Sequence, residues 1–197
     1  SKCFAFVLLN QFSLIAFTSA IEPLRIANRI AQKELYKWRL LSEDGGSVTC
    51  SNGVSIQVNS KLEEINRDET ILLCSGENVR KQTSKNLLTW IRRESRKGMP
   101  VGALCTATYV LAKAGILESH TATVHWENRE ALIEEFPNLE LSQAIYVIDK
   151  KRLTAAGGSA ALDLMLRILS IDHGIDLSNS IADQMIYASI RTEYDEQ

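Results

Sequence analysis

Short apolar runs alternate with longer amphipathic stretches along most of the chain. The short runs predict strands of a buried sheet, at residues 4–9, 36–42, 70–74, 101–104, 121–124, 145–148 and 153–156. The longer stretches repeat apolar residues at helical spacing, at residues 13–31, 84–98, 106–114, 127–135, 160–171 and 177–190. Because strand and helix alternate, we expect an α/β domain with a mostly parallel sheet and helices on both faces.

Turn and capping residues mark several boundaries. Ser51-Asn52-Gly53 separates residues 48–50 from 54–58 and predicts a hairpin, since Asn-Gly is a strong turn signal. Ser84 is expected to cap the helix that follows it, and Gly98 is expected to end that helix. Because the chain contains no internal repeat and no low-complexity linker, we expect one domain.

Composition and charge exclude several classes of protein. With 197 residues, 45% hydrophobic and 23% charged, the chain can bury one large core, which excludes intrinsic disorder. The net charge of −2 gives no chain-wide footprint for nucleic acid. The sequence lacks the run of about 18 apolar residues that spans a bilayer, and its opening does not resemble a signal peptide. No membrane partner is therefore expected.

The four cysteines, Cys3, Cys50, Cys74 and Cys105, are widely spaced and form no C-x-x-C pair. This spacing favours neither a zinc ribbon nor a thioredoxin-type site. In a chain with a large core we interpret them as reduced thiols and expect a cytoplasmic protein. We expect no metal and no cofactor.

Candidate chemistry lies where the predicted strands end. Ligands of open parallel sheets bind beyond the carboxyl ends of the strands. The segments at these ends are residues 10–11, 75–78, 105–106, 125–126 and 156–159.

Cys105 is the most prominent of these residues. It joins a predicted strand directly to a predicted helix, with Ala103 and Ala107 where a tight strand-to-helix elbow needs small residues. A helix N-terminus would lower the pKa of the thiol and make it reactive. The alternative is a buried core cysteine, since free Cys packs as a small hydrophobe.

His125 also follows a predicted strand and could serve Cys105 as a base, or could be a structural histidine. His120 and His173 do not occupy positions that suggest catalysis. Gly157-Gly158-Ser159 is interpreted as a helix cap, with an anion-binding nest as the alternative. The basic run 92–97 is interpreted as a solvated helix end and not as a nucleic-acid patch.

Taken together, the motifs resemble those of one known family. They lie at residues 12–14, 21–28, 36–38, 44–46, 104–106, 111–117, 122–126, 136–137, 154–158, 162–164 and 172–174. In this order they resemble the ThiJ/PfpI branch of the class I glutamine amidotransferase-like superfamily, and more narrowly the N-terminal domain of GlxA-type regulators of the AraC family. The resemblance covers about residues 3 to 190. It implies a flavodoxin-like three-layer sandwich that senses a ligand and forms a homodimer.

The resemblance also implies a domain organisation. In such regulators a C-terminal pair of helix-turn-helix motifs binds DNA. We therefore expect residues 1–190 to form the sensing and dimerisation domain, and residues 191–197 to begin a linker to a DNA-binding domain absent from this chain. DNA would be contacted only through that absent domain.

The sequence departs from the enzymes of the superfamily at one position. Those enzymes place an acidic side chain near the nucleophile, and the matching position here is Ala16. Glu22 is the nearest acid along the same predicted helix. At the elbow, Ala103 and Ala107 replace the usual glycines, which L-residues tolerate only at negative φ. The missing acid favours a pocket kept for binding and not for catalysis.

The leading hypothesis is a non-catalytic effector-sensing and dimerisation domain of a transcriptional regulator. The resemblance implies a small nitrogen-containing effector, such as a betaine, a carnitine derivative or arginine. The expected ligand-binding residues are Glu22, Gly76, Glu77, Asn78, Cys105, Thr106, Tyr109, His125 and Trp126. The alternatives are a cysteine-dependent hydrolase or deglycase, with Cys105 as nucleophile and His125 as base, and a purely structural dimerisation module.

Overall fold

A computed structural model describes all residues, 1–197, and is built on one seven-stranded sheet. The strand order is β10-β11-β7-β6-β1-β2-β5. The strands are β1 (Lys2–Leu8), β2 (Tyr36–Ser42), β5 (Ser60–Lys61), β6 (Glu69–Cys74), β7 (Val101–Leu104), β10 (Tyr146–Asp149) and β11 (Arg152–Ala155). All neighbouring pairs are parallel except β10 and β11. The expected mostly parallel sheet is confirmed.

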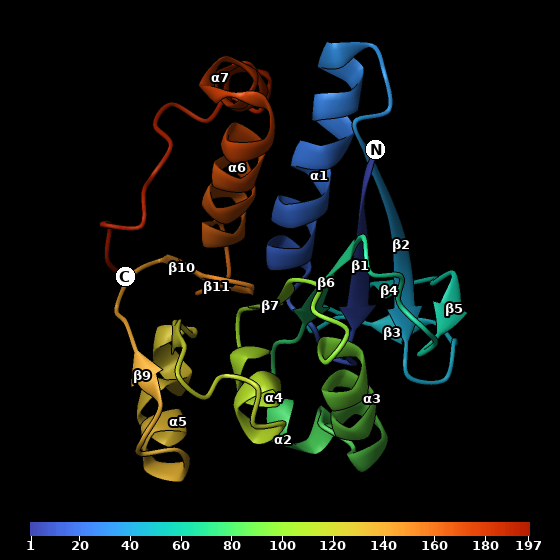
Figure 1. Cartoon of the computed structure of the whole chain (residues 1–197), viewed down its shortest axis with the longest axis vertical. Helices are drawn as coiled ribbons and strands as arrows, with labels where there is room; N and C mark the ends of the chain where they lie inside the picture. The colour runs from blue at the N-terminus through green and yellow to red at the C-terminus, as the bar shows by residue number, and fades with distance from the viewer.

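Helices cover both faces of this sheet (Figure 1). One face carries α1 (Leu14–Ala31), α6 (Ala160–His173) and α7 (Ile175–Gln184), and the other carries α2 (Val79–Gln82), α3 (Lys85–Ser95), α4 (Thr108–Lys113) and α5 (Arg129–Glu135). A 3₁₀ helix, η1 (Trp126–Asn128), precedes α5. No helix is long and apolar enough to cross a membrane.

The two cores follow from the alternation of side chains along β1. Phe4 and Phe6 pack into the core beneath α1, α6 and α7, whereas Ala5 and Val7 pack into the core against α3 and α4. All four side chains are buried. A strand with apolar residues on both faces must lie in the centre of a sheet, and β1 does lie between β6 and β2.

Local signals explain several boundaries. Ser84 caps α3 as predicted, by accepting a hydrogen bond from the Leu87 N–H at 3.0 Å, and Ser13 caps α1 through the Ala16 N–H at 3.3 Å. The predicted hairpin forms from β3 (Val48–Thr49) and β4 (Ser55–Ile56).

Other boundaries differ from the predictions. The helix α3 ends at Ser95, so Gly98 lies in the following turn, with φ +91°, and is not the C-cap. The helix α7 ends at Gln184 and not at residue 190, because Ile186 adopts a left-handed φ of 55°. The basic run 92–97 at the end of α3 is not simply solvated, since the Arg92 guanidinium donates to the Ala114 carbonyl at 3.0 Å.

The segment 121–124 was predicted as a strand of the main sheet, and this was wrong. Only β8 (Thr121–Ala122) forms, and it pairs with β9 (Glu140–Leu141) outside the main sheet. The backbone N–H of Thr123 donates to the Thr154 hydroxyl at 3.0 Å and not to a strand carbonyl, which ends the ladder.

Candidate functional site

Cys105 lies in a tight turn between β7 and α4, which we call the Cys105 elbow (residues 104–107). Its φ is +63°, in the left-handed region that non-glycine residues rarely adopt. Its N–H donates to the Ala155 carbonyl at 3.0 Å, which ties the elbow to the end of β11. Ala103 and Ala107 both avoid positive φ, as their side chains require. The backbone strain is therefore carried by Cys105 itself.

The environment of the thiol opposes its ionisation. Burial raises the pKa of Cys105 to about 11, a hydrogen bond from the Thr106 backbone lowers it, and the charge of Glu127 raises it further. The expectation that a helix end would lower this pKa is wrong. The helix α4 begins only at Thr108, and desolvation of the buried thiol dominates. At neutral pH the thiol is protonated and a weak nucleophile.

His125 is attached to the Cys105 elbow through its backbone. Its N–H donates to the Cys105 carbonyl at 3.2 Å. Its ring Nδ1 accepts from the Glu127 N–H at 3.3 Å and the ring stacks on Trp126 at 5.7 Å, while no hydrogen bond joins the ring to the Cys105 sulfur. The ring therefore serves as the N-cap of η1 in this arrangement. His120 and His173 lie elsewhere, beside Asp149 and Tyr36 respectively.

A buried hydroxyl pair joins the elbow to the end of β6. Thr106 Oγ1 lies 2.6 Å from Ser75 Oγ and donates to the Gly76 carbonyl at 2.7 Å. Because a hydroxyl has only one hydrogen, Ser75 must be the donor in its contact with Thr106. Residues 75–76 and 106, predicted at separate strand ends, thus meet in one network.

Gln11 belongs to the same edge of the sheet. Its Oε1 accepts from Asn78 Nδ2 at 2.9 Å, and its backbone carbonyl accepts from the Glu77 N–H at 3.1 Å. A side chain on residue 76 would collide with this carbonyl, so the close approach requires glycine. Sequence reasoning placed Gln11 at a strand end but left it out of the predicted site.

Gly157 forms the opposite wall of the elbow. A Cβ on Gly157 would lie 2.9 Å from the Cys105 sulfur, and its φ is +100°. Gly158 also has a positive φ. Ser159 occupies the N-cap position of α6, but its hydroxyl accepts from the Arg191 guanidinium at 2.7 Å and not from a helix amide. Ser159 is therefore at the N-cap position, as predicted, but its side chain does not make a capping hydrogen bond.

Two predicted ligand residues are engaged elsewhere. The Glu22 carboxylate pairs with Arg25 at 2.6 Å on α1, about 12 Å along the helix axis from Leu14. Tyr109 has Arg80 over its ring at 5.5 Å and contacts Phe136 edge-on. Ala16 lies at the position where the enzymes are expected to have an acid. It is a residue of α1, and its side chain is buried in the core between this helix and the sheet.

Trp126 and Glu127 remain open to a ligand. The side chain of Trp126 is 63% exposed, and that of Glu127 is 66% exposed. One face of the indole lies against His125. No group of three or more His, Cys, Asp or Glu side chains is arranged to hold a metal ion.

Known regulators match almost the whole chain. It is 39% identical over 197 residues to the HTH-type transcriptional regulator CdhR of Pseudomonas aeruginosa, covering 100% of this chain and 58% of CdhR. It is 37% identical over 192 residues to GbdR, an HTH-type transcriptional regulator of the same species, covering 98% of this chain and 52% of GbdR. The chain thus spans just over half the length of these relatives.

An enzyme is a more distant relative. The isonitrile hydratase of Pseudomonas putida is 25% identical over 150 residues, covering 76% of this chain and 65% of the enzyme.

The same fold is found in a solved regulator structure and in a known family. An AraC family transcriptional regulator from Pseudomonas putida superposes with a TM-score of 0.83 and 26% identity, covering 94% of this chain and 100% of that chain. Residues 3–171 match the DJ-1/PfpI family. Since this match covers most of the chain, the chain belongs to the DJ-1/PfpI family.

Proposed function

We propose that this chain is the effector-sensing and dimerisation domain of a helix-turn-helix transcriptional regulator, and that its elbow binds and does not catalyse. The protonated thiol of Cys105 supports the non-catalytic part of this proposal, because a nucleophile with a pKa of about 11 is almost wholly un-ionised at neutral pH and its neighbour His125 makes no hydrogen bond to it. The match of almost the whole chain to about half of two HTH-type regulators supports the regulatory role.

The effector is proposed to be a small nitrogen-containing cation. Trp126 offers an exposed indole face, and Glu127 offers a carboxylate one residue further along η1. Cations bind indole faces and carboxylates, and a partly desolvated cation–π contact contributes about 1–2 kcal/mol. Tyr109 is omitted from this proposed site because Arg80 already occupies its ring.

Calorimetry tests the binding proposal directly. The chain is titrated with betaines, carnitine derivatives and arginine, and then with their uncharged isosteres. We expect binding of a cationic compound that weakens about tenfold in Trp126→Ala and is partly retained in Trp126→Phe, which keeps an aromatic face. Absence of binding at millimolar concentration would contradict direct sensing.

An enzymatic function is the second candidate. The strained Cys105 backbone and the similarity to an isonitrile hydratase favour it. The enzyme would use Cys105 as nucleophile and His125 as base, which requires the ring to turn from the Glu127 N–H toward the sulfur. Rapid stoichiometric alkylation at neutral pH, abolished by Cys105→Ser, would support it and contradict the binding proposal.

The remaining parts of the proposal concern the whole protein. We propose a cytoplasmic homodimer whose association is altered by the effector, with DNA contacted through a separate helix-turn-helix domain. Static light scattering with and without the effector tests the dimer. A monomer at all concentrations would count against a dimerisation role.

A further inference from the structure

The residues that follow α7 return across the domain toward the elbow. We call residues 186–197 the C-terminal strap. In Figure 1 the strap descends from α7 and ends beside β10, on the side of the molecule where α5 and β9 lie. Two groups of polar contacts hold it, one near each end.

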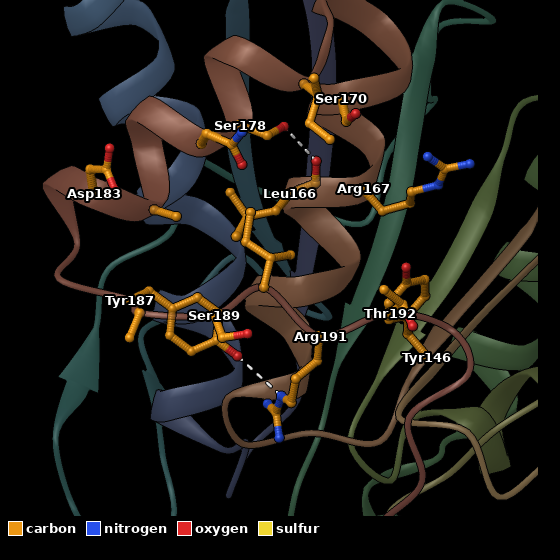
Figure 2. A pocket seen from close by; sticks show the side chains of 15 residues that line it. Tyr146, Leu166, Arg167, Ser170, Ser178, Asp183, Tyr187, Ser189, Arg191 and Thr192 are labelled. Carbon is orange, nitrogen blue, oxygen red and sulfur yellow. Dashed lines mark hydrogen bonds between the residues drawn. The ribbon is translucent and has the colours of Figure 1, made fainter.

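The first attachment is centred on Asp163 of α6, whose side chain is fully buried. Its carboxylate accepts from the Tyr187 hydroxyl at 2.9 Å, the Arg191 N–H at 2.7 Å and Arg191 Nη2 at 2.9 Å. The same Nη2 donates to Ser159. Figure 2 shows the ring of Tyr187 and the Arg191 guanidinium side by side, joined by a hydrogen bond. The strap therefore satisfies a buried charge of the domain.

The second attachment lies at the far end of the strap. The Ile145 N–H donates to the Asp195 carbonyl at 3.0 Å, and the Gln197 N–H donates to the Gln143 carbonyl at 3.2 Å. The side-chain amide of Gln197 donates to the Val124 carbonyl at 3.1 Å. These bonds fix the strap to two segments, one at Val124 and one at residues 143–145.

One of these segments contacts Cys105 directly, and the other reaches it through residues 156–157. Val124 precedes His125, whose N–H donates to the Cys105 carbonyl. The Ile145 carbonyl accepts from the Ala156 N–H at 2.8 Å, and Ala156 precedes Gly157, which packs against Cys105. Two short chains of bonded and packed groups thus connect the strap to the elbow.

Tyr187 and Ile190 pack against the hydrophobic core at the first attachment, but beyond it residues 192–197 are all exposed, and Tyr194 is 87% exposed. Ile186 is 93% exposed. A groove of about 460 Å³ lies between α6, α7 and residues 187–192, and Figure 2 shows Leu166 and Ser170 of α6 facing it. Ile186, where the strap begins, has a left-handed φ of 55° that is unfavourable for a β-branched residue. A segment held by polar contacts at its ends can open as a unit.

We infer that the C-terminal strap is a releasable element whose docking is coupled to the conformation of the Cys105 elbow. A docked strap holds residues 124–125 and, through Ile145, residues 156–157 against Cys105, and a released strap lets them open. The regulatory role of this coupling rests on the proposed function. If docking of the strap changes the affinity of the elbow for an effector by some factor, then binding of the effector changes the docking equilibrium of the strap by the same factor.

The coupling is tested without any effector, so its outcome is independent of effector binding. Two variants loosen opposite ends, Arg191→Gln at the buried carboxylate and Gln197→Ala at the loops. We measure hydrogen exchange of peptides 143–146 and 186–197, and the rate of Cys105 alkylation by a maleimide at pH 9. In each variant we expect at least threefold faster exchange in both peptides and at least threefold faster alkylation. Arg25→Gln, which removes an exposed arginine from α1, is the matched control and should change neither.

Two results would overturn the inference. One is faster exchange of the strap with alkylation of Cys105 unchanged, because the strap would then be mobile but uncoupled. The other is faster alkylation with unchanged strap exchange, because the effect would then bypass the strap. If Arg191→Gln fails to fold because Asp163 is left unpaired, Gln197→Ala decides the question, since it disturbs no buried charge.

Discussion

Gly157 and Cys105 are in direct contact, so close that a Cβ on Gly157 would lie 2.8 Å from the Cys105 Cβ. Backbone and side chain of Cys105 therefore pack against a residue that follows β11, the strand paired with β7. Because the Gly157 φ is also +100°, we expect Gly157→Ala to destabilise the fold by about 2–4 kcal/mol, combining overpacking with backbone strain. Chemical denaturation measures this change.

Gly158 provides the matched control for this substitution. It also has a positive φ, +53°, but a Cβ there meets nothing within 4 Å. Gly158→Ala should therefore lower the free energy of unfolding only through backbone strain, by about 1 kcal/mol. If the two substitutions destabilise the fold equally, the close contact between residue 157 and Cys105 does not contribute to the loss of stability.

Alkylation of Cys105 should depend steeply on pH. Burial raises the pKa of its thiol to about 11, so the thiolate fraction increases with pH throughout the neutral and mildly alkaline range. We expect the alkylation rate to rise about tenfold per pH unit between pH 7 and 10, without a plateau below pH 10. Mass spectrometry of the Cys105 peptide follows the reaction, and Cys105→Ser corrects for the other cysteines.

A plateau near pH 6–7 would contradict this prediction. It would mean that the thiol ionises readily in solution, as an activated nucleophile does. The enzymatic candidate would then replace the binding proposal.

The hydroxyl of Thr106 should be needed to hold the elbow to β6. Thr106→Val keeps the shape but removes the partner of Ser75 and the donor to Gly76. Because these groups are buried, we expect a loss of about 1–3 kcal/mol in the free energy of unfolding. Thr106→Ser retains the hydroxyl and should recover most of it. If Thr106→Ser destabilises the fold and Thr106→Val does not, the methyl group and not the hydroxyl network stabilises the elbow, which would contradict this prediction.

The sheet and its main helices could be predicted because their signals are local. The apolar run of β1 indicates a strand buried on both faces, and Ser13 and Ser84 cap the helices that they precede. The end of α7 could not be predicted in this way. The apolar periodicity continues to Ile190, but the chain turns at Ile186 and its later residues bond to Asp163 and Ile145 instead.

The position of the candidate site could be predicted from the sequence, but the pKa shift of its thiol and the charged partners of its side chains could not. Strand ends of a parallel sheet converge, so Gly76, Thr106 and Cys105 were correctly brought to one edge. The sign of the Cys105 pKa shift depends on how deeply the thiol is buried and where α4 begins, which are tertiary properties. The pairing of Tyr109 with Arg80 likewise joins two helices and leaves no local signal.

Ile186→Gly should stabilise the protein. Ile186 is the left-handed residue that ends α7, where the Tyr187 N–H donates to the Ala182 carbonyl at 2.8 Å and the Ile186 N–H donates to Asp183 at 3.1 Å. Glycine is preferred at this position, and a non-glycine residue loses about 1–2 kcal/mol there. The isoleucine side chain is almost fully exposed, so its removal sacrifices little burial. Glycine loses more backbone entropy on folding than isoleucine does, and this cost offsets part of the relieved strain. We therefore expect the free energy of unfolding to increase by up to about 1 kcal/mol.

Thermal unfolding should show this gain as an increase in Tm of about 2–4 °C for a chain of this size. Ile186→Ala is the matched control, since alanine shortens the side chain but keeps the unfavourable φ. It should recover less of the gain than glycine does, because the strain lies in the backbone. If alanine and glycine stabilise equally, the side chain and not the left-handed backbone would be the source of the strain where the strap begins.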